Sequence, residues 1–289
     1  MDSHSVFFEP FSKLAKFYYR KLRAGHYEKK YAPDFDSVPT YLMFLGYQRS
    51  GHTLLGALLD AHPETWVAHE LNVLEYIKQG ALRNAIFAQL IAQGKWFRAR
   101  GNVWTGYSYH VPGQWQGRYR QLKVIGDKRG GASTRMLQAR PELLGQLYKH
   151  IDKDIRIIHN YRNPYDNITT RARDGNLNRL EVSPDRLEKI IKGHFQQIDF
   201  IHQLSQSKEH HILHVRHEDF VDNPRQSLSE ICHFLGIPPY PDYLDAAAGI
   251  VRKSPNKSRY KIHWPEQAKQ LVARHMARYD FLSNYQFDE

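Results

Sequence analysis

Cysteine is almost absent from this chain: Cys232 is the only one among its 289 residues. A single cysteine excludes an intrachain disulfide and a zinc site built from cysteines. Long apolar runs are also missing, since no stretch approaches the roughly 18 residues that suggest a membrane-spanning helix. Residues 1–10 lack a basic segment followed by an apolar one, so we expect no secretory signal. No cluster of metal-ligand side chains stands out. These absences predict a cytoplasmic protein that needs no metal.

The chain has enough apolar residues for a core and an excess of positive charge. Apolar residues make up 41% of it, more than a disordered chain would carry. The formal net charge is +11, which favours a polyanion or a multiply charged small ligand as partner. The basic residues are scattered and lack a zinc-finger spacing or an RNA-binding aromatic signature, so we do not expect nucleic acid as the partner.

The first 38 residues are predicted to form a basic amphipathic extension of the domain at residues 39–289. Apolar side chains recur there at helical spacing, with lysines and arginines between them: Phe7, Phe11, Leu14, Tyr18 and Leu22. Two interpretations stay open. The helix packs on its own domain, or residues 5–25 contact an anionic membrane surface and make the protein membrane-peripheral.

Strand and helix patterns alternate after residue 39. Short apolar runs predict strands at 41–46, 122–125, 155–161 and 212–215. Helical periodicity is found at 54–61, 135–151, 185–206, 223–235 and 265–278. This order predicts a single α/β domain of the P-loop type, with a central parallel sheet and helices on both faces. Ligands of such sheets bind at the carboxyl ends of the strands.

The sharpest motif is Gly46–Thr53 (GYQRSGHT), which follows the first predicted strand and opens its helix. Its spacing is that of a Walker A loop, in which backbone N–H groups and a helix N-terminus surround an anion. A nucleoside triphosphatase needs lysine where this chain has His52, which is mostly neutral at pH 7. The permanent charge is supplied by Arg49 instead. The loop therefore suits a phosphosulfate better than a metal-bound triphosphate.

Residues 47–55 (YQRSGHTLL) and 58–63 (LLDAHP) resemble the 5′-phosphosulfate loop and first helix of the sulfotransferases that use 3′-phosphoadenosine-5′-phosphosulfate (PAPS). The resemblance is closer to the tyrosylprotein, Golgi-type and bacterial branches than to the cytosolic phenol and steroid enzymes. It implies transfer of a sulfuryl group from PAPS to a hydroxyl or amine acceptor, in line and without a metal, with release of adenosine 3′,5′-bisphosphate (PAP). The loop residues implied to bind the donor are Arg49, Ser50, Gly51, His52, Thr53 and Leu54.

A second strand-to-helix junction carries Arg162, with Asn163 as a good N-cap and Pro164 as a good first helical residue. In the resembling family, an arginine here and a hydroxyl residue eight positions later hold the 3′-phosphate. Arg162 and Thr170 match this identity and spacing. A guanidinium grips phosphate oxygens through charge-assisted bonds, and a hydroxyl adds another.

A third segment, residues 251–261, has five basic residues among its eleven and resembles the family's Arg-Lys-Gly segment. Ser254 replaces the glycine. Two candidates for the 3′-phosphate stay open: Arg252 with Lys253, and Lys257 with Arg259. Residues 217–224 (HEDFVDNP) and 234–238 (FLGIP) resemble two further signatures, which place His217 near the adenine.

The resemblance also assigns the chemistry. The histidine base of the cytosolic enzymes has no counterpart here, because a glycine stands two residues after Lys128. The tyrosylprotein branch uses a glutamate seven residues after the proline of the first helix, and Glu70 lies seven residues after Pro63. We therefore predict Glu70 as the base, Arg49 and Lys128 as electrostatic partners and His52 as a secondary catalytic candidate.

Two rival interpretations are a P-loop nucleotide kinase or NTPase, which leaves the pair at 162 and 170 unexplained, and a non-catalytic polyanion-binding module. The acceptor is expected to be a small molecule, a carbohydrate or a lipid-linked compound; phenolic and peptide acceptors also fit. The aromatic stretch 96–115 either lines its pocket or belongs to the local core.

Overall fold

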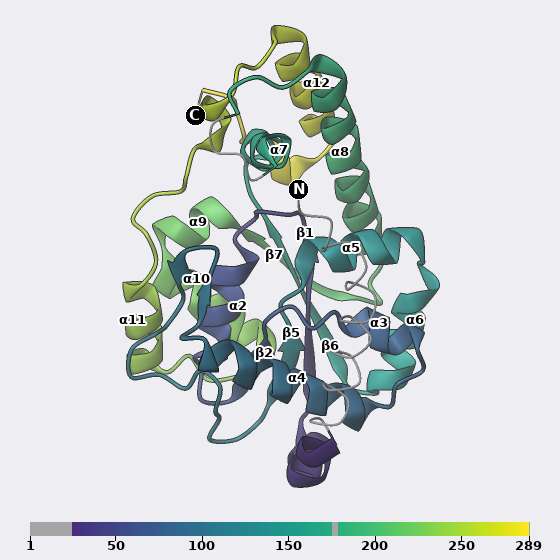
Figure 1. Ribbon diagram of the computed structural model, residues 1–289, viewed down its shortest axis with the longest axis vertical. Helices are drawn as coiled ribbons and strands as arrows, with labels where there is room; N and C mark the ends of the chain where they lie inside the picture. The colour runs from purple at the N-terminus through teal and green to yellow at the C-terminus, as the bar shows by residue number, and fades with distance from the viewer. Residues whose placement is uncertain (1–24, 175–178, 289) are drawn as a thin grey trace, which may run out of the picture.

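The computed structural model describes residues 25–174 and 179–288. Its centre is a five-stranded parallel sheet in the order β2-β5-β1-β6-β7 (Figure 1). The strands are β1 (Thr40–Gly46), β2 (Thr65–Ala68), β5 (Val124–Asp127), β6 (Asp154–Tyr161) and β7 (His211–Arg216). The predicted α/β class is confirmed, and the four predicted strands are present. The sequence analysis missed β2, whose four residues are too few to show a period.

Both faces of the central strand β1 are buried. Successive residues of a strand point to opposite sides of the sheet. Tyr41, Met43 and Leu45 of β1 enter one hydrophobic cluster, whereas Leu42 and Phe44 enter the other. Helices from the chain segments between the strands cover both clusters, as a parallel sheet requires.

One cluster is completed by α2 (His52–Asp60), α9 (His217–Asp222), α10 (Pro224–Leu235) and α11 (Pro241–Gly249). The other is completed by α3 (Val73–Lys78), α4 (Arg83–Ala99), α5 (Gly130–Ala139), α6 (Glu142–Ile151) and α8 (Pro184–Gln206). The segment 135–151, predicted as one helix, is divided between α5 and α6. The division falls at Pro141, because proline has no N–H to continue a helix and restricts the residue before it.

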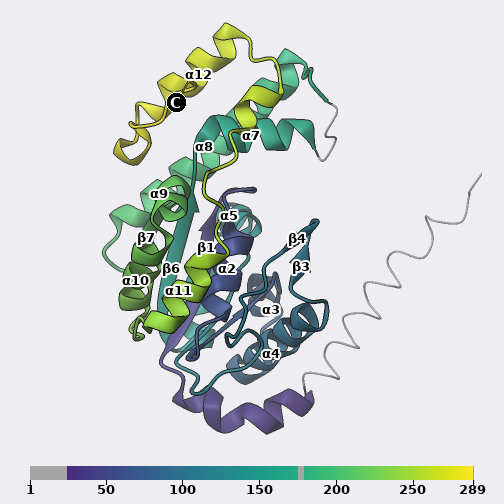
Figure 2. The same cartoon turned by 90° about the vertical axis from the view of Figure 1, so that its left-hand side faces the viewer.

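Helices α7 (Pro164–Arg173) and α12 (Glu266–Met276) and the short turn η1 (Ser258–Lys261) lie beyond the carboxyl end of β6 (Figures 1 and 2). A two-stranded hairpin of β3 (Val103–Trp104) and β4 (Tyr107–Ser108) rises from the α4 side toward them (Figure 2). The hairpin belongs to the aromatic stretch 96–115. Together these segments surround the edge of the sheet at which ligands are expected.

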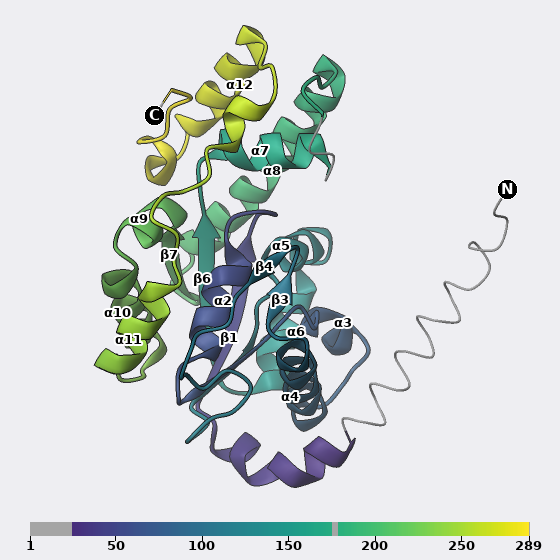
Figure 3. The ribbon, with the colours of Figure 1, turned by 60° about the vertical axis from the view of Figure 1, so that its left-hand side comes forward.

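Residues 25–37 form a helix at the opposite end of the molecule from α12 (Figure 3). Phe35 of this helix is fully buried and packs edge-on against Phe87 of α4, with ring centroids 5.6 Å apart. The helix is therefore anchored to the domain by its C-terminal half. Residues 1–24, which contain nearly all of the predicted amphipathic segment 5–25, lie outside the described residues. Within the described ranges, no helix combines the length and apolarity required to cross a membrane.

Candidate functional site

The two predicted anion-binding junctions are neighbours because β1 and β6 are adjacent parallel strands. Their register pairs Gly46 with Asn160, so both strands end at the same level. The loop after β1 and Arg162 after β6 therefore lie side by side. Arg162 Nη1 donates a hydrogen bond to the carbonyl oxygen of Arg49, 3.2 Å away.

The loop at residues 46–51 has the backbone of an anion-binding turn. Gly46 and Gly51 have φ angles of 144° and 89°, and Arg49 adopts a left-handed φ of 69°. A Cβ atom on Gly51 would lie 2.6 Å from His217 Nδ1, so only glycine fits there. Gly51 leads directly into α2, whose first N–H groups have no acceptor within the helix and lie at the positive end of the helix dipole.

Helix α7 holds this loop from the other side. The Asn167 side chain donates from Nδ2 to the Gln48 carbonyl oxygen at 2.6 Å and to Ser50 Oγ at 3.1 Å. Asn167 and Ser50 are both fully buried. Sequence reasoning missed Asn167, although it lies on the helix face between Asn163 and Thr170 and one turn from each.

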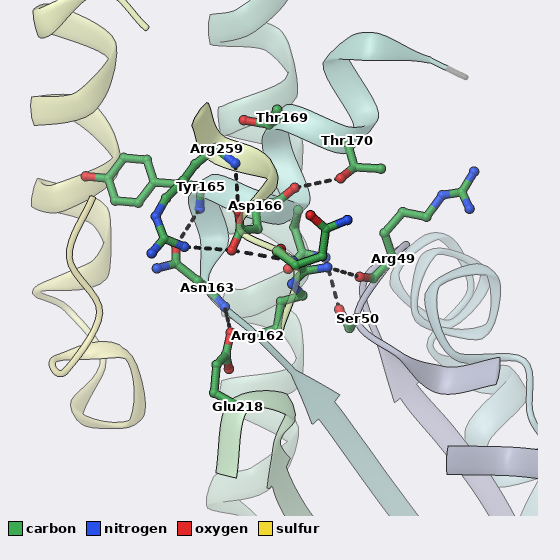
Figure 4. Close-up of polar contacts among 12 residues, drawn as sticks. Arg49, Ser50, Arg162, Asn163, Tyr165, Asp166, Thr169, Thr170, Glu218 and Arg259 are labelled. Carbon is green, nitrogen blue, oxygen red and sulfur yellow. Dashed lines mark hydrogen bonds and ion pairs between the residues drawn. The ribbon is translucent and has the colours of Figure 1, made fainter. Parts of the chain in front are cut away.

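Asp166 ties three segments together at the start of α7 (Figure 4). Its carboxylate accepts from the backbone N of Arg259 at 2.7 Å and from Nη1 of the same residue at 2.8 Å, and pairs with Arg162 Nη2 at 3.4 Å. Arg162 Nη2 also donates to the carbonyl oxygen of Asn256. Arg162 Nε is buried and has no partner in the described structure. Thr170 Oγ1 donates to the Asp166 carbonyl oxygen, 2.9 Å away.

The loop at residues 251–261 contains both candidate pairs for the 3′-phosphate, and the structure places their members differently. Arg252 and Ser254 line the cavity, and the Arg252 guanidinium lies 4.6 Å from the centre of the Tyr107 ring in the β3–β4 hairpin. Lys253 and Lys257 are exposed and are not among the lining residues. Arg259 is buried in its ion pair with Asp166, as described above.

The two histidines at the loop are neutral at pH 7; His52 is buried and His217 is half-buried. His52 Nε2 donates to the Leu45 carbonyl oxygen at 3.2 Å, and burial lowers the pKa of its ring to about 4. The ring lies under the loop, where a Cβ atom on Gly130 would be 2.2 Å from its Nε2. Burial, and next the charge of Arg162, lower the pKa of His217 to about 3. Its ring instead touches Gly51 at the cavity.

Lys128 and Glu70 form an ion pair at the end of β5. Lys128 Nζ lies 2.9 Å from Glu70 Oε1 and 2.9 Å from Thr53 Oγ1 at the start of α2. Burial by itself would raise the pKa of Glu70, but the Lys128 ammonium outweighs it and leaves this pKa below its ordinary value. Glu70 is thus a carboxylate at neutral pH.

Asp127 fixes the backbone that carries Glu70, a function that sequence reasoning did not assign. Its carboxylate accepts from the backbone N–H groups of Leu71 at 2.9 Å, Asn72 at 2.7 Å and Val73 at 3.2 Å. These bonds hold a strained turn, since Glu70 and Asn72 have left-handed φ angles of 55° and 72°. The only signal in the sequence was an acidic residue directly before Lys128, two residues after a predicted strand.

One cavity of about 1910 Å³ unites these groups. Of the predicted site residues, those that line it are Arg49, Gly51, His52, Thr53, Leu54, Glu70, Lys128, Arg162, Thr170, His217, Arg252 and Ser254. Ser50 is buried behind the loop, and Lys253 and Lys257 lie outside the cavity. Within residues 25–174 and 179–288, no group of three or more His, Cys, Asp or Glu side chains is arranged to hold a metal.

Comparison with known proteins identifies the family. The model of the sulfotransferase family matches residues 42–242, which is more than half of the chain. The sulfotransferase domain from the Synechococcus PCC 7002 olefin synthase has a similar fold, with a TM-score of 0.50, 18% identity, and coverage of 84% of this chain and 96% of that one. Sulfotransferase STF9 from Mycobacterium avium has a TM-score of 0.50 and 11% identity, covering 90% of this chain and 82% of that one.

A search of curated proteins gave no match. The family match disfavours both rivals, the nucleotide kinase and the non-catalytic module, and agrees with the order of motifs along the chain. The chain belongs to the sulfotransferase family and is a PAPS-dependent sulfotransferase.

Proposed function

We propose that this cavity binds PAPS and transfers its sulfuryl group to a hydroxyl or amine of the acceptor. The observation that carries the proposal is the meeting of two anion-binding junctions, at Gly46–Thr53 and at Arg162, beside the Lys128–Glu70 pair. An adenosine with phosphates at both its 3′ and 5′ positions needs two such junctions. A nucleoside triphosphate needs one.

The residues around the cavity fit this donor. The backbone of Gly51–Thr53 and the Arg49 side chain would hold the 5′-phosphosulfate. Arg162, whose buried Nε lacks a partner, would hold the 3′-phosphate with Thr170. Arg252 and Ser254 would complete that end, because they line the cavity and the alternative Lys257 does not. His217 would lie near the adenine.

The bound donor supplies the sulfuryl group, and the protein supplies a base and fixed positive charge. Glu70 accepts the proton of the acceptor as the bond from its oxygen or nitrogen to sulfur forms. The bond from sulfur to the bridging oxygen breaks, and the negative charge passes to the 5′-phosphate of PAP. Lys128 and Arg49 stabilise this charge in a site that is partly shielded from water. The two junctions make the remaining contribution, because they hold the donor so that the acceptor atom, the sulfur and the leaving oxygen lie in line.

His52 is not assigned a catalytic part in this proposal. Its ring bonds to the Leu45 carbonyl oxygen beneath the loop and has a strongly lowered pKa. We propose that the His52 ring supports the loop from below. Its backbone N–H, at the start of α2, belongs to the group that would hold the 5′-phosphosulfate.

Calorimetric titration with PAP tests the donor assignment. We expect binding at micromolar concentration or tighter, unchanged by magnesium, in the wild-type protein. Arg162→Ala should weaken it by at least tenfold, since a charge-assisted bond to phosphate contributes about 1.5–3 kcal/mol. Arg225→Ala is the matched control, because Arg225 pairs with Asp245 on the surface. Binding of ATP with magnesium in place of PAP would overturn the proposal.

A further inference from the structure

Three arginines lie on the wall of the cavity. Arg129 precedes α5, Arg135 lies within α5, and Arg171 lies in α7; all three line the cavity. Among the described residues, none of them forms an ion pair, although the charge of Arg129 acts on the nearby carboxyls of Glu70 and Asp127. Two other basic residues of the same wall do form ion pairs: Arg186 pairs with Asp174 at 3.4 Å, and Lys192 pairs with Glu188 at 2.5 Å.

The three guanidinium groups influence one another. Burial lowers the pKa of Arg135, and the charge of Arg129 lowers it further. Burial likewise lowers the pKa of Arg171, and Arg135 is the neighbouring charge that adds to the effect. Arg129 and Arg171 are half-buried and Arg135 is exposed toward solvent. Like charges that lie close together repel one another, and an anion placed between them removes that cost. The cluster therefore has the electrostatics of an anion site.

The cluster begins beside the base and extends away from it. Arg129 follows Lys128 in the chain, and its Nη1 lies 3.4 Å from the Glu70 carbonyl oxygen. Arg135 comes six residues later, which corresponds to about 9 Å along a helix at about 1.5 Å per residue. An anion bound at Arg135 would thus be displaced along α5 from the part of the cavity that faces Glu70.

Aromatic side chains supply another wall. Trp104, Tyr107 and Tyr109, on and next to the β3–β4 hairpin, line the cavity, and Tyr107 is 47% exposed. Flat aromatic faces suit the apolar faces of sugar rings. The aromatic lining therefore favours a saccharide acceptor.

We infer that the acceptor of this enzyme is an acidic saccharide, whose carboxylate or sulfate group is bound by Arg135 and Arg171 while its hydroxyl faces Glu70. This inference rests on the proposed function, because it takes the remainder of the cavity for the acceptor. The size of the cavity agrees with it, since about 1910 Å³ exceeds the roughly 300–1,000 Å³ of a pocket for one drug-sized ligand.

The test measures acceptor binding directly, with the full chain saturated with PAP. A chondroitin 4-sulfate hexasaccharide is titrated first, followed by the same hexasaccharide after removal of its sulfates and reduction of its carboxylates. We expect the acidic sugar to bind at least tenfold more tightly than its neutral form. The double variant Arg135→Gln/Arg171→Gln should remove most of that difference, and either single variant a part of it.

Arg140→Gln is the matched control for general charge. Arg140 ends α5, is exposed and is not among the cavity-lining residues, so its loss should change the affinity for the acidic sugar less than twofold. An equal loss in Arg140→Gln and Arg135→Gln would overturn the inference, because it would mean unspecific attraction. So would equal or undetectable binding of the two sugars, or preferred binding of an acidic tyrosine peptide.

The PAP titration separates this inference from the donor proposal. The arginine variants should bind PAP with wild-type affinity. If they bind PAP at least tenfold more weakly, the cluster belongs to the donor site and the inference fails while the donor proposal stands. If the wild-type protein itself does not bind PAP, the donor proposal fails, and with it the assignment of this cavity to an acceptor.

Discussion

Lys128 and Glu70 differ in exposure although their charged atoms are 2.9 Å apart: the lysine side chain is 3% exposed and the glutamate side chain 39%. The ammonium is held between the end of β5 and the start of α2, because its second partner is Thr53 Oγ1 at 2.9 Å. The carboxylate stands at the edge of the cavity, where an acceptor can reach it. This difference agrees with the roles proposed above, in which Lys128 stabilises charge and Glu70 receives a proton.

Replacing Glu70 tests the base. We expect Glu70→Gln to lower kcat for transfer from PAPS by about 10²–10⁴, the usual range for loss of a general base. PAP affinity should stay within about threefold, because Glu70 is not proposed to touch the nucleotide. The matched control is Glu75→Gln, which removes a surface pair with Lys78. A kcat near the wild-type value would exclude Glu70 as the base.

Replacing Gly51 tests the loop. A methyl group there would lie 2.6 Å from His217 Nδ1, and the φ angle of 89° strains any other residue. Gly51→Ala should therefore weaken PAP binding by at least tenfold and lower the thermal midpoint. Gly145→Ala is the control: this glycine lies inside α6 with nothing within 4 Å of the added atom, so alanine should stabilise by about 0.5–1 kcal/mol. Unchanged PAP binding in Gly51→Ala would contradict this geometry.

Asp166 should matter for stability and for the donor. Asp166→Asn removes the charge that faces two buried guanidinium groups, a loss that costs about 3–5 kcal/mol when a buried pair is broken. We expect a lower unfolding free energy in urea and weaker PAP binding, because the turn η1 loses its hold on α7. The exposed pair of Asp174 and Arg186 gives the control Asp174→Asn, which should cost less than about 1 kcal/mol. Equal losses in the two variants would refute a special part for Asp166.

Buried histidines should make the protein sensitive to acid. Burial lowers the pKa of His194 to about 3, and both of its ring nitrogens are buried without partners in the described structure. In the unfolded chain its pKa is about 6.5. Its contribution to stability is therefore complete above pH 6.5 and is lost as the pH falls toward the folded value. At pH 5 the loss is about 2 kcal/mol for each such histidine.

His194→Leu separates this residue from the others. The leucine cannot take up a proton, so the fall in unfolding free energy between pH 7 and pH 5 should shrink by about 2 kcal/mol. At pH 7 the variant should be about 1 kcal/mol more stable, because two unpaired polar atoms leave the core. The exposed His233→Leu serves as the control and should leave the pH slope unchanged. A His194→Leu slope equal to the wild-type slope would show that another group causes the acid loss.

The sequence by itself determined the parts of the site that depend on local order along the chain. A strand, a glycine-containing loop and a helix must follow one another for residues 46–60 to surround an anion, and that succession can be read directly. The same holds for Arg162 with its N-cap Asn163, and both junctions are where they were predicted. Periodicity also decided the α/β class, because a strand and a buried helix face repeat with different spacing.

Only the tertiary structure decided which distant residues meet. Arg252 lines the cavity, whereas Arg259 forms a buried ion pair with Asp166. No local pattern distinguishes the two arginines, since both lie in one basic stretch. The placement of Asp127 behind Glu70 and of Asn167 behind Gln48 depends on which strands are neighbours in the sheet. The grouping of Arg129, Arg135 and Arg171 arises in the same way. A net charge of +11 counts these arginines, but only the folded chain brings all three to the wall of one cavity.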